Sequence, residues 1–339
     1  MPATTQTLVN NVTLAATLAR RSKGYVDQII KALPFYWYMM EKKRYKGKDG
    51  GLRLEWNVQY DLDEREKSYQ GLDVLPKMEQ DNVTVAIAEW KQYHGDIVIS
   101  GADMLKNQGG NKIFDLLQQK EDNAKASLQL ALARDLYEDG TGNNYKVITG
   151  LGAITPEDPT SGTLFAIDRA TNAFWRSQYL DVNAKYYDVT NSRFTLREKM
   201  DVMRTRCGRL GKGDAKSKYP DLGLCTESYM HWFETGVDKS RRYVDQKAAD
   251  AGFDSIKFKG MTIMPDELCP ESSTSGEQQC FFLNSNYLEL AYMNGANFKP
   301  TPMTRAENQD GFYMYIFWMG ELICETPAKH GRLFGVQDL

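Results

Sequence analysis

Apolar and polar residues alternate strictly in one early stretch of the chain, residues 52–60, which read LRLEWNVQY. A period of two predicts a β-strand with one apolar face, and nine residues of strand span about 30 Å. A second strand is predicted at 83–90, after the strongly polar segment 61–73. The two strands are expected to form a long hairpin whose distal part is charged. The apolar face of the first strand carries Leu52, Leu54, Trp56, Val58 and Tyr60.

The hairpin raises the question of what covers it. A two-stranded hairpin alone is only marginally stable in water. Either the rest of the chain covers it, most simply as part of an ordinary sheet in the same domain, or a neighbouring molecule does. The pattern by itself leaves these alternatives open.

Apolar residues spaced at three and four predict helices in two other places. The longer one runs from 111 to 137 without proline or internal glycine, which makes it about 40 Å long, and Gly140 marks its end. Helical patterns also occupy 6–33, where we expect Pro34 to end the helix.

The remainder alternates between helical and strand patterns. Turns and short strands are expected over 139–165. A capping box formed by Thr195 and Glu198 opens a helix that extends to about Arg209. A short strand at 223–226 precedes a helix that begins at Glu227. Further strands are predicted in 255–264 and 280–290, and the tail 311–334 is predicted as one long apolar strand.

A dense group of charged and aromatic residues lies at 167–179, IDRATNAFWRSQY. Such a group suits a catalytic site, a nucleic-acid contact, a contact between subunits or a structural corner. Asp168 beside Arg169 is expected to have a lowered pKa, which suits an ion pair better than a general acid. Trp175 and Arg176 are of the types enriched in protein–protein contacts. No nucleophile or histidine pattern accompanies them.

The composition limits which kinds of catalytic or metal site the chain can contain. The chain has 339 residues, 42% hydrophobic and 26% charged, as is usual for globular proteins. Its three histidines have no local metal-ligand spacing, and its five cysteines form no C-x-x-C pair, so no metal and no cofactor is expected. Cys269 and Cys280 flank a polar loop and are close enough in sequence to bridge, but reduced thiols are expected without a secretion signal. Glycine pairs such as those in GRLGKG lack the spacing of a phosphate loop.

Charge is unevenly distributed. Residues 1–48 hold nine basic and two acidic side chains, a net charge of +7, whereas the remainder holds 33 basic and 43 acidic residues, a net charge of −10. A basic segment on an acidic body suggests an anionic neighbour, or simply a solvated leader. No apolar run reaches the roughly 20 residues of a membrane span, so a soluble protein made in the cytoplasm is expected.

The order of these features resembles the major capsid proteins of tailed bacteriophages, which share the HK97-type fold. The stretches that carry the resemblance are, in order, WKQYHGDIVISGADMLKN, LYEDGTGN, ITGL followed by IDRATNAFWR, FKGMTIMPDELCP and FFLNSNYLEL. The likeness covers essentially the whole chain. It implies an α+β HK97-like fold with an N-terminal arm at 1–45, an E-loop hairpin at 46–82, a P-domain at 83–140 with the long helix as its spine, an A-domain at 141–302 and a returning P-domain strand at 303–339.

The resemblance also implies a function without catalysis. Hexamers and pentamers of the chain would close an icosahedral shell around double-stranded DNA, with portal, scaffold and possibly cement proteins as further partners, in a virion assembled in the host cytoplasm. The E-loop would lie on the adjacent subunit, and 167–179 would be a packing and ion-pair segment. Neither Lys–Asn crosslinking nor a long scaffolding segment carries over from the family. The expected subunit-contact residues are Trp56, Asp63, Glu64, Arg65, Lys67, Asp168, Arg169, Trp175 and Arg176, and the DNA-facing ones are Lys42, Lys43 and Arg44.

Three other functions stay open at this point. An encapsulin-like compartment would share the fold but enclose enzymes. A soluble hydrolase that uses carboxylates would be a monomer or small oligomer with a deep cleft. A stand-alone nucleic-acid-binding protein is disfavoured by the charge of −10 outside the leading segment.

Overall fold

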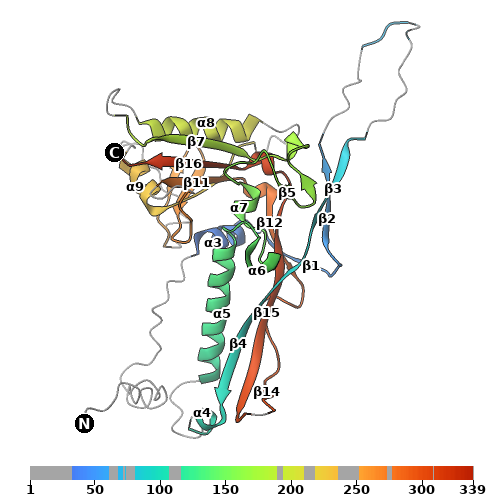
Figure 1. Ribbon diagram of the computed structural model, residues 1–339, viewed down its shortest axis with the longest axis vertical. Coiled ribbons are helices and arrows are strands. Elements are labelled where there is room, and N and C mark those ends of the chain that lie inside the picture. The colour runs from blue at the N-terminus through green and yellow to red at the C-terminus, as the bar shows by residue number, and fades with distance from the viewer. Residues whose placement is uncertain are drawn as a thin grey trace. The chain divides into compact units, whose positions relative to one another are not determined.

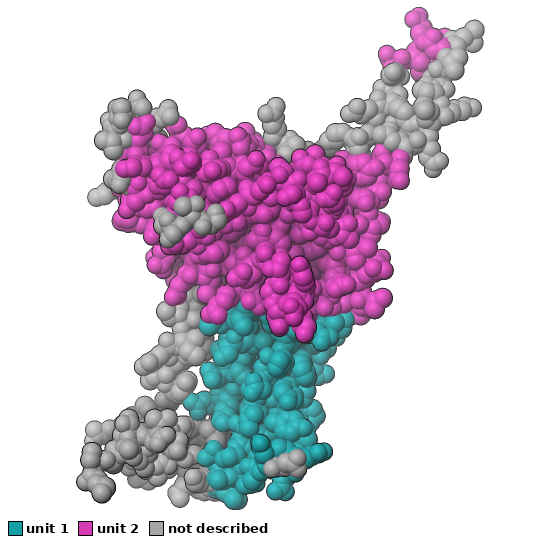
Figure 2. All heavy atoms as spheres, viewed as in Figure 1, with its two compact units in different colours: residues 1–32, 92–132, 293–319 teal, residues 33–91, 133–292, 320–339 magenta. Residues whose placement is uncertain are grey.

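The described residues belong to two compact units, which Figure 2 distinguishes by colour. Unit 1 takes its described residues from 92–132 and 293–319, and unit 2 takes them from 33–91, 133–292 and 320–339. The computed structural model describes residues 33–60, 68–71, 73, 81–106, 116–188, 194–209, 218–235, 252–272, 277–307 and 309–338. The helices expected within 6–33 therefore lie almost entirely outside the described residues.

A six-stranded mixed sheet forms the centre of unit 2 (Figure 1). The β7–β16 and β8–β10 pairs are parallel, and the other pairs are antiparallel. In spatial order its strands are β7 (Gln178–Lys185), β16 (Gly331–Gln337), β11 (Gln278–Leu283), β8 (Leu222–Cys225), β10 (Met261–Pro265) and β9 (Ile256–Phe258).

Both faces of this sheet are covered. Every residue of β8 and β11 is buried, as expected for short apolar runs in a central position. Helices α8 (Thr195–Arg209) and α9 (Glu227–Thr235) pack on one face in a cluster that includes Phe282. Phe281, the next residue along the strand, contacts Tyr137, with ring centroids 6.0 Å apart. Both helices begin where the sequence predicts them.

Unit 1 is built around the first part of β15 (Gly311–Cys324). Strands β4 (Lys91–Ser100), β13 (Lys299–Pro300) and β14 (Thr304–Arg305) pair with it, and α4 (Gly101–Lys106) follows β4. The long helix is α5 (Leu116–Asp135), which ends two residues before the predicted end. Its last turn tightens, because Tyr137 and Glu138 donate to carbonyls three residues back.

Helix α3 (Pro34–Glu41) begins at Pro34, whose missing N–H would be unpaired in a first helical turn anyway. The helix that Pro34 is predicted to end lies outside the described residues. One prediction about the tail is wrong. The tail 311–334 is two strands and not one, since β15 and β16 are separated by the 3₁₀ turn η6 (Pro327–Lys329). A proline at that point removes a donor that a continuous ladder would need.

The stretch 139–165 is also more helical than predicted. Around VITGLGAIT the chain forms the helical turn α7 (Leu151–Ile154), and a second short turn, α6, spans Gly142–Tyr145. A Cβ at Gly150 would lie 2.5–2.6 Å from three backbone oxygens of residues 135–138. Because Gly150 has no Cβ, α7 can pack directly on residues 135–138, which follow the body of α5. The Leu151 N–H donates to the Leu136 carbonyl there.

The predicted hairpin is present and forms a separate two-stranded sheet. Strand β2 (Leu54–Gln59) pairs with β3 (Val83–Ala88), from Leu54 opposite Ala88 to Gln59 opposite Val83. Leu54 and Val58 are buried and the intervening polar residues are exposed, so the predicted alternation is confirmed over these residues. The alternative in which the hairpin joins an ordinary sheet is wrong for the described strands.

The last part of β15 pairs with β12 (Leu288–Met293), which in turn pairs with β1 (Tyr45–Lys48). A 3₁₀ turn, η5 (Ser285–Tyr287), connects β11 to β12. Within the described residues, no helix is both long and apolar enough to cross a membrane.

Candidate functional site

The root of the hairpin packs on the segment 163–176 of the same chain. The Trp56 ring meets Phe165 edge-on, with centroids 5.1 Å apart, and Tyr60 stacks on Phe174 at 4.9 Å. The Ile87 N–H donates to the Phe165 carbonyl at 3.0 Å. At this end the cover that the hairpin requires is therefore supplied within the chain.

That segment is itself fixed by two buried side chains. Arg169 is 4% exposed and donates to the carbonyls of Ala153 and Ile154 at 2.6 and 2.9 Å. Trp175 is 1% exposed and donates from Nε1 to the Leu164 carbonyl at 3.0 Å. Burial lowers the pKa of Arg169 to about 10. Both residues thus hold the 163–176 segment together from inside; a contact with another subunit stays a prediction for them.

Asp168 and Arg176 lie nearer the surface. The pKa of Asp168 is lowered, chiefly by the hydrogen bond from the Ala170 N–H and only slightly by the charge of Arg176. The expected ion pair between Asp168 and Arg169 does not form, because the Arg169 guanidinium is committed to backbone carbonyls. Arg176 in turn donates to the carbonyls of Arg169 and Ala170, both at 2.6 Å.

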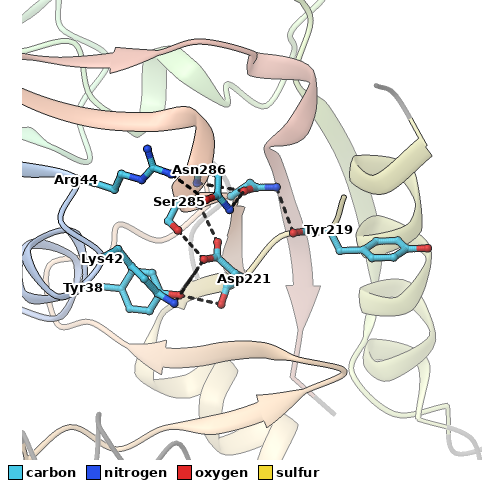
Figure 3. A network of polar contacts seen from close by, with 8 residues as sticks. Tyr38, Lys42, Arg44, Tyr219, Asp221, Ser285 and Asn286 are labelled. Carbon is cyan, nitrogen blue, oxygen red and sulfur yellow. Dashed lines mark hydrogen bonds and ion pairs between the residues drawn. The ribbon is translucent and has the colours of Figure 1, made fainter. Parts of the chain in front are cut away.

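A second polar centre fastens α3 to the rest of unit 2 (Figure 3). The carboxylate of Asp221 accepts from the N–H and hydroxyl of Ser285 at 2.7 and 2.6 Å. It also accepts from the Tyr38 hydroxyl at 3.1 Å, and Lys42 Nζ lies 3.9 Å away. A charged acceptor with several donors forms stronger hydrogen bonds than a neutral one. We call Asp221, Ser285, Tyr38 and Lys42 the α3 anchor.

The basic residues after α3 continue this attachment. Arg44 donates to the Asn286 side-chain oxygen at 2.8 Å. Lys46 and Lys48 form ion pairs of 2.7 and 2.6 Å with Glu289 on β12, and although burial opposes it, these contacts lower the pKa of Glu289. Of the three residues predicted to face DNA, Lys42 and Arg44 therefore contact the body of the chain. Lys43 is exposed, with a positive φ of 56°.

The remaining predicted contact residues divide into two groups. Trp56 is half-buried at the hairpin root. The predicted charges of the hairpin tip lie outside the described residues: Asp63, Glu64, Arg65 and Lys67.

The five cysteines and His330 are buried. All five cysteines are buried free thiols, so Cys269 and Cys280 are not bridged, and burial raises the pKa of Cys207 to about 12. His330 is buried, which lowers its pKa to about 3, and its Nδ1 accepts from the Asn284 N–H at 3.2 Å. In the part of the chain that the structure describes, no three potential metal-ligating side chains gather.

The α3 anchor could hardly be predicted from the sequence. Asp221 lies 183 residues from Tyr38 and 64 from Ser285, and an aspartate before a short strand has no local signature. The one available hint was the polar NSN step between the apolar runs of β11 and β12, which places Ser285 in a turn.

Comparison with known proteins adds evidence on the fold. No family model and no curated protein sequence matches the chain. A solved structure of the cyanophage A-1(L) capsid asymmetric unit is similar, with a TM-score of 0.63 and 15% identity over 94% of this chain and 96% of that chain. The capsid of Myoviridae phage XM1 has a TM-score of 0.56 at 10% identity, covering 96% and 100%.

The chain has the HK97-like capsid fold. The expected α+β class is thereby confirmed. The SrpI encapsulin of Synechococcus elongatus PCC 7942 has the same fold, with a TM-score of 0.57 at 10% identity over 96% of this chain and 95% of that chain. Because the identities are this low, the HK97-like fold is what these comparisons establish.

Proposed function

We propose that the chain is a major capsid protein, which assembles as hexamers and pentamers into an icosahedral shell around the double-stranded DNA of a tailed phage. The observation that supports this proposal is the shared fold: each of the two phage capsid structures matches this chain over nearly the full length of both proteins. This likeness over nearly the whole chain supports a structural role, and because a fold alone does not set a function, assembly itself has to be tested. The function is then assembly and not turnover.

The family's regions map onto the chain as part of this proposal. The arm is 1–45, the E-loop 46–82, the P-domain 83–140 with 303–339, and the A-domain 141–302. A closed shell needs heterologous surfaces that meet around its axes, and obligate contacts bury on the order of 2,000 Å² or more. The tip of the hairpin and the 163–176 segment are the proposed sources of such surfaces, with Trp56 and Tyr60 setting the direction in which the hairpin leaves the body.

Electron microscopy of the purified protein is the primary test. Regular shells tens of nanometres across support the proposal, and nuclease-resistant DNA inside particles from infected or producing cells supports the phage role. A stable monomer on size-exclusion chromatography contradicts it and favours the hydrolase alternative. The encapsulin-like alternative is favoured by the SrpI likeness, and it predicts shells that hold protein cargo and no DNA.

The DNA-facing residues can be tested separately from assembly. Lys43 is the clean probe, since Lys42 and Arg44 also contact Asp221 and Asn286. If Lys43 contacts phosphates, Lys43→Ala lowers the salt concentration at which DNA is released, because each lost phosphate contact reduces the salt dependence of binding. Lys299→Ala, which removes an exposed lysine of unit 1, is the control. Unchanged DNA retention in Lys43→Ala removes Lys43 from the DNA-facing set.

A further inference from the structure

Unit 2 contains an open pocket of about 510 Å³ beside the 163–176 segment. One end of α8 contributes Arg206, and the chain that enters β7 contributes Ser177 and Tyr179. Arg176 also lines the pocket. Two guanidinium groups and one hydroxyl are thus gathered on a single concave surface.

Both arginines are held in place but retain free donors. Arg206 donates from Nη1 to the Tyr179 carbonyl at 3.1 Å. Arg176 donates from Nε and Nη2 to the carbonyls of Arg169 and Ala170, both at 2.6 Å. Since a guanidinium has five N–H donors, each arginine keeps N–H groups for another acceptor. The backbone contacts fix the two side chains in advance, so a ligand that binds them has less side-chain entropy to remove.

The third donor in this pocket has no partner. Ser177 is 3% exposed, and its hydroxyl makes no hydrogen bond among the described residues. A buried hydroxyl without a partner costs free energy, and a ligand oxygen that accepts from it would recover that cost. The hydroxyl of Thr160, which also lines the pocket, is by contrast satisfied, since it donates to Asp158 at 2.6 Å. Ser177 is therefore the donor in this pocket that a ligand oxygen would complete.

Positive charge gathers beside the pocket. Lys329 precedes His330, whose carbonyl accepts from the Gln178 N–H at 2.9 Å, so the turn η6 adjoins the start of β7. Burial raises the pKa of the Cys207 thiol, and the charges of Lys329 and Arg206 both oppose that rise. The two cations therefore lie near the same end of α8. An anion in the pocket would be attracted by Lys329 as well as by the arginines.

Two carboxylates lie near Arg176 and offset part of its charge. The pKa of Asp158 is lowered chiefly by hydrogen bonds from the hydroxyl and N–H of Thr160, and only slightly by the charge of Arg176. The pKa of Asp168 is lowered in the same way, chiefly by a backbone N–H. Both carboxylates are thus engaged within the chain. Arg206 is consequently the guanidinium whose charge a bound anion would meet most fully.

We propose that this pocket binds a phosphate dianion, either free phosphate or the terminal phosphate of a small phosphorylated molecule. A phosphate has three or four terminal oxygens, enough to accept from both guanidinium groups and from the Ser177 hydroxyl together, whereas a carboxylate has only two. Its double charge also matches two guanidinium groups, and charge-assisted hydrogen bonds of this kind are strong. The inference goes beyond the proposed function and does not depend on it.

Isothermal titration calorimetry of the full-length protein tests the site. Sodium phosphate is the probe, at a pH near 8 where phosphate is mainly the dianion, and sodium acetate at the same ionic strength is the matched anion. Phosphate should bind saturably and acetate should not. Adenosine 5′-monophosphate, with adenosine as its control, then separates the two sources. Tighter binding of the nucleotide than of phosphate identifies a phosphorylated small molecule as the ligand class, and equal or weaker binding identifies free phosphate.

Three variants assign the binding to these residues. Arg206→Gln should weaken phosphate binding by at least about tenfold, because it removes a charged donor. Arg197→Gln removes the same charge from an exposed position of the same helix and should bind phosphate like the wild type. Ser177→Ala should weaken binding by about tenfold, yet leave the thermal midpoint without phosphate unchanged or higher, because the hydroxyl that it removes is unpaired. A hydroxyl that serves only folding would instead lower that midpoint.

Several results would overturn the site. One is the absence of saturable phosphate binding in the wild type, and another is equal binding of acetate. Equal weakening in Arg197→Gln and Arg206→Gln would show that only the overall charge of α8 attracts the anion. Wild-type affinity in Ser177→Ala would remove the hydroxyl from the site. Each of these results leaves the capsid proposal standing, because electron microscopy tests assembly independently of phosphate.

Discussion

Two of the sheets in unit 2, the six-stranded sheet and the β2–β3 hairpin, differ in how their faces are covered. The six-stranded sheet buries both faces, with Phe282 against the helices and Phe281 against Tyr137. The β2–β3 hairpin buries only the face that carries Leu54 and Val58. Its other face leaves Val83 and Val85 exposed at 51% and 43%.

This difference in how the faces are covered indicates which surface serves folding and which serves assembly. The six-stranded sheet has a complete core supplied by the same chain, so changes in it act on the free energy of unfolding. The hairpin is fixed at its root by Trp56 and Tyr60, and its outer face has exposed apolar residues that a single copy leaves uncovered. Changes on that face should therefore act on contacts between copies.

The largest effect is expected in the six-stranded sheet. Phe282→Ala removes a fully buried ring and should lower the free energy of unfolding by about 3–5 kcal/mol. Urea unfolding followed by tryptophan fluorescence measures it. Phe282→Leu should cost less than half as much, because most of the apolar volume remains. An alanine variant as stable as the wild type would mean that this sheet is not the core of unit 2.

A pH-dependent effect follows from one acidic residue in the body. Glu321 on β15 is fully buried, which raises its pKa to about 8 from the usual glutamate value of 4.5. The folded state then keeps a proton that the unfolded state releases, so the free energy of unfolding falls as pH rises from about 4.5 to about 8, by up to about 4 kcal/mol. Glu321→Gln should remove this loss and be the more stable protein at pH 8.

The substitution keeps the local hydrogen bonds. Oε1 of Glu321 accepts from the N–H groups of Thr149 and Leu322 at 2.8 and 2.9 Å, and the glutamine oxygen can do the same. Glu289→Gln on neighbouring β12 is the control with the opposite sign. Its pKa is lowered, so the stability it contributes is present at neutral pH and lost on acidification. Equal pH profiles for wild type and Glu321→Gln would contradict the prediction.

The hairpin root should show a smaller and local effect. Trp56→Ala removes the contact with Phe165 and should weaken the root by about 1 kcal/mol. Amide exchange in β2 and β3 should accelerate while exchange in β11 stays unchanged. Asn57→Ala, at an exposed position of the same strand, serves as the comparison. If exchange in β11 accelerates equally, the hairpin and the six-stranded sheet are one cooperative unit.

The elements of the fold that depend on local pattern could be predicted from sequence. The alternation in 52–60 defined β2, and the capping box at Thr195 located the start of α8. The order of the elements was enough to indicate the fold that the structural comparisons confirm. The break between β15 and β16 at Pro327 was missed, because proline both begins helices and breaks strands, and only the tertiary context selects between these roles.

The contacts of the candidate site could be predicted only in part. The group at 167–179 was identified as a packing segment, but the targets of Arg169 are backbone carbonyls of α7, and carbonyls leave no trace in a sequence. Asp221 was missed because its partners are distant along the chain. The charged residues of the hairpin tip are visible in the sequence itself, but the contacts that they make stay a prediction.

The smallest effect on stability is expected at the exposed face of the hairpin. Val83→Ser with Val85→Ser should change the free energy of unfolding of the isolated chain by less than about 0.5 kcal/mol, since both side chains are exposed. If another copy covers this face, the same pair of changes should weaken assembly strongly, because each buried valine contributes about 1.5 kcal/mol or more. Light scattering against protein concentration measures this. Asn57→Ser, on the same face opposite Val85, alters no apolar surface and should assemble like the wild type. Unimpaired assembly of the double valine variant would show that the exposed face stays in contact with water in the shell, and the distinction between folding and assembly surfaces would then have to be confined to the hairpin tip.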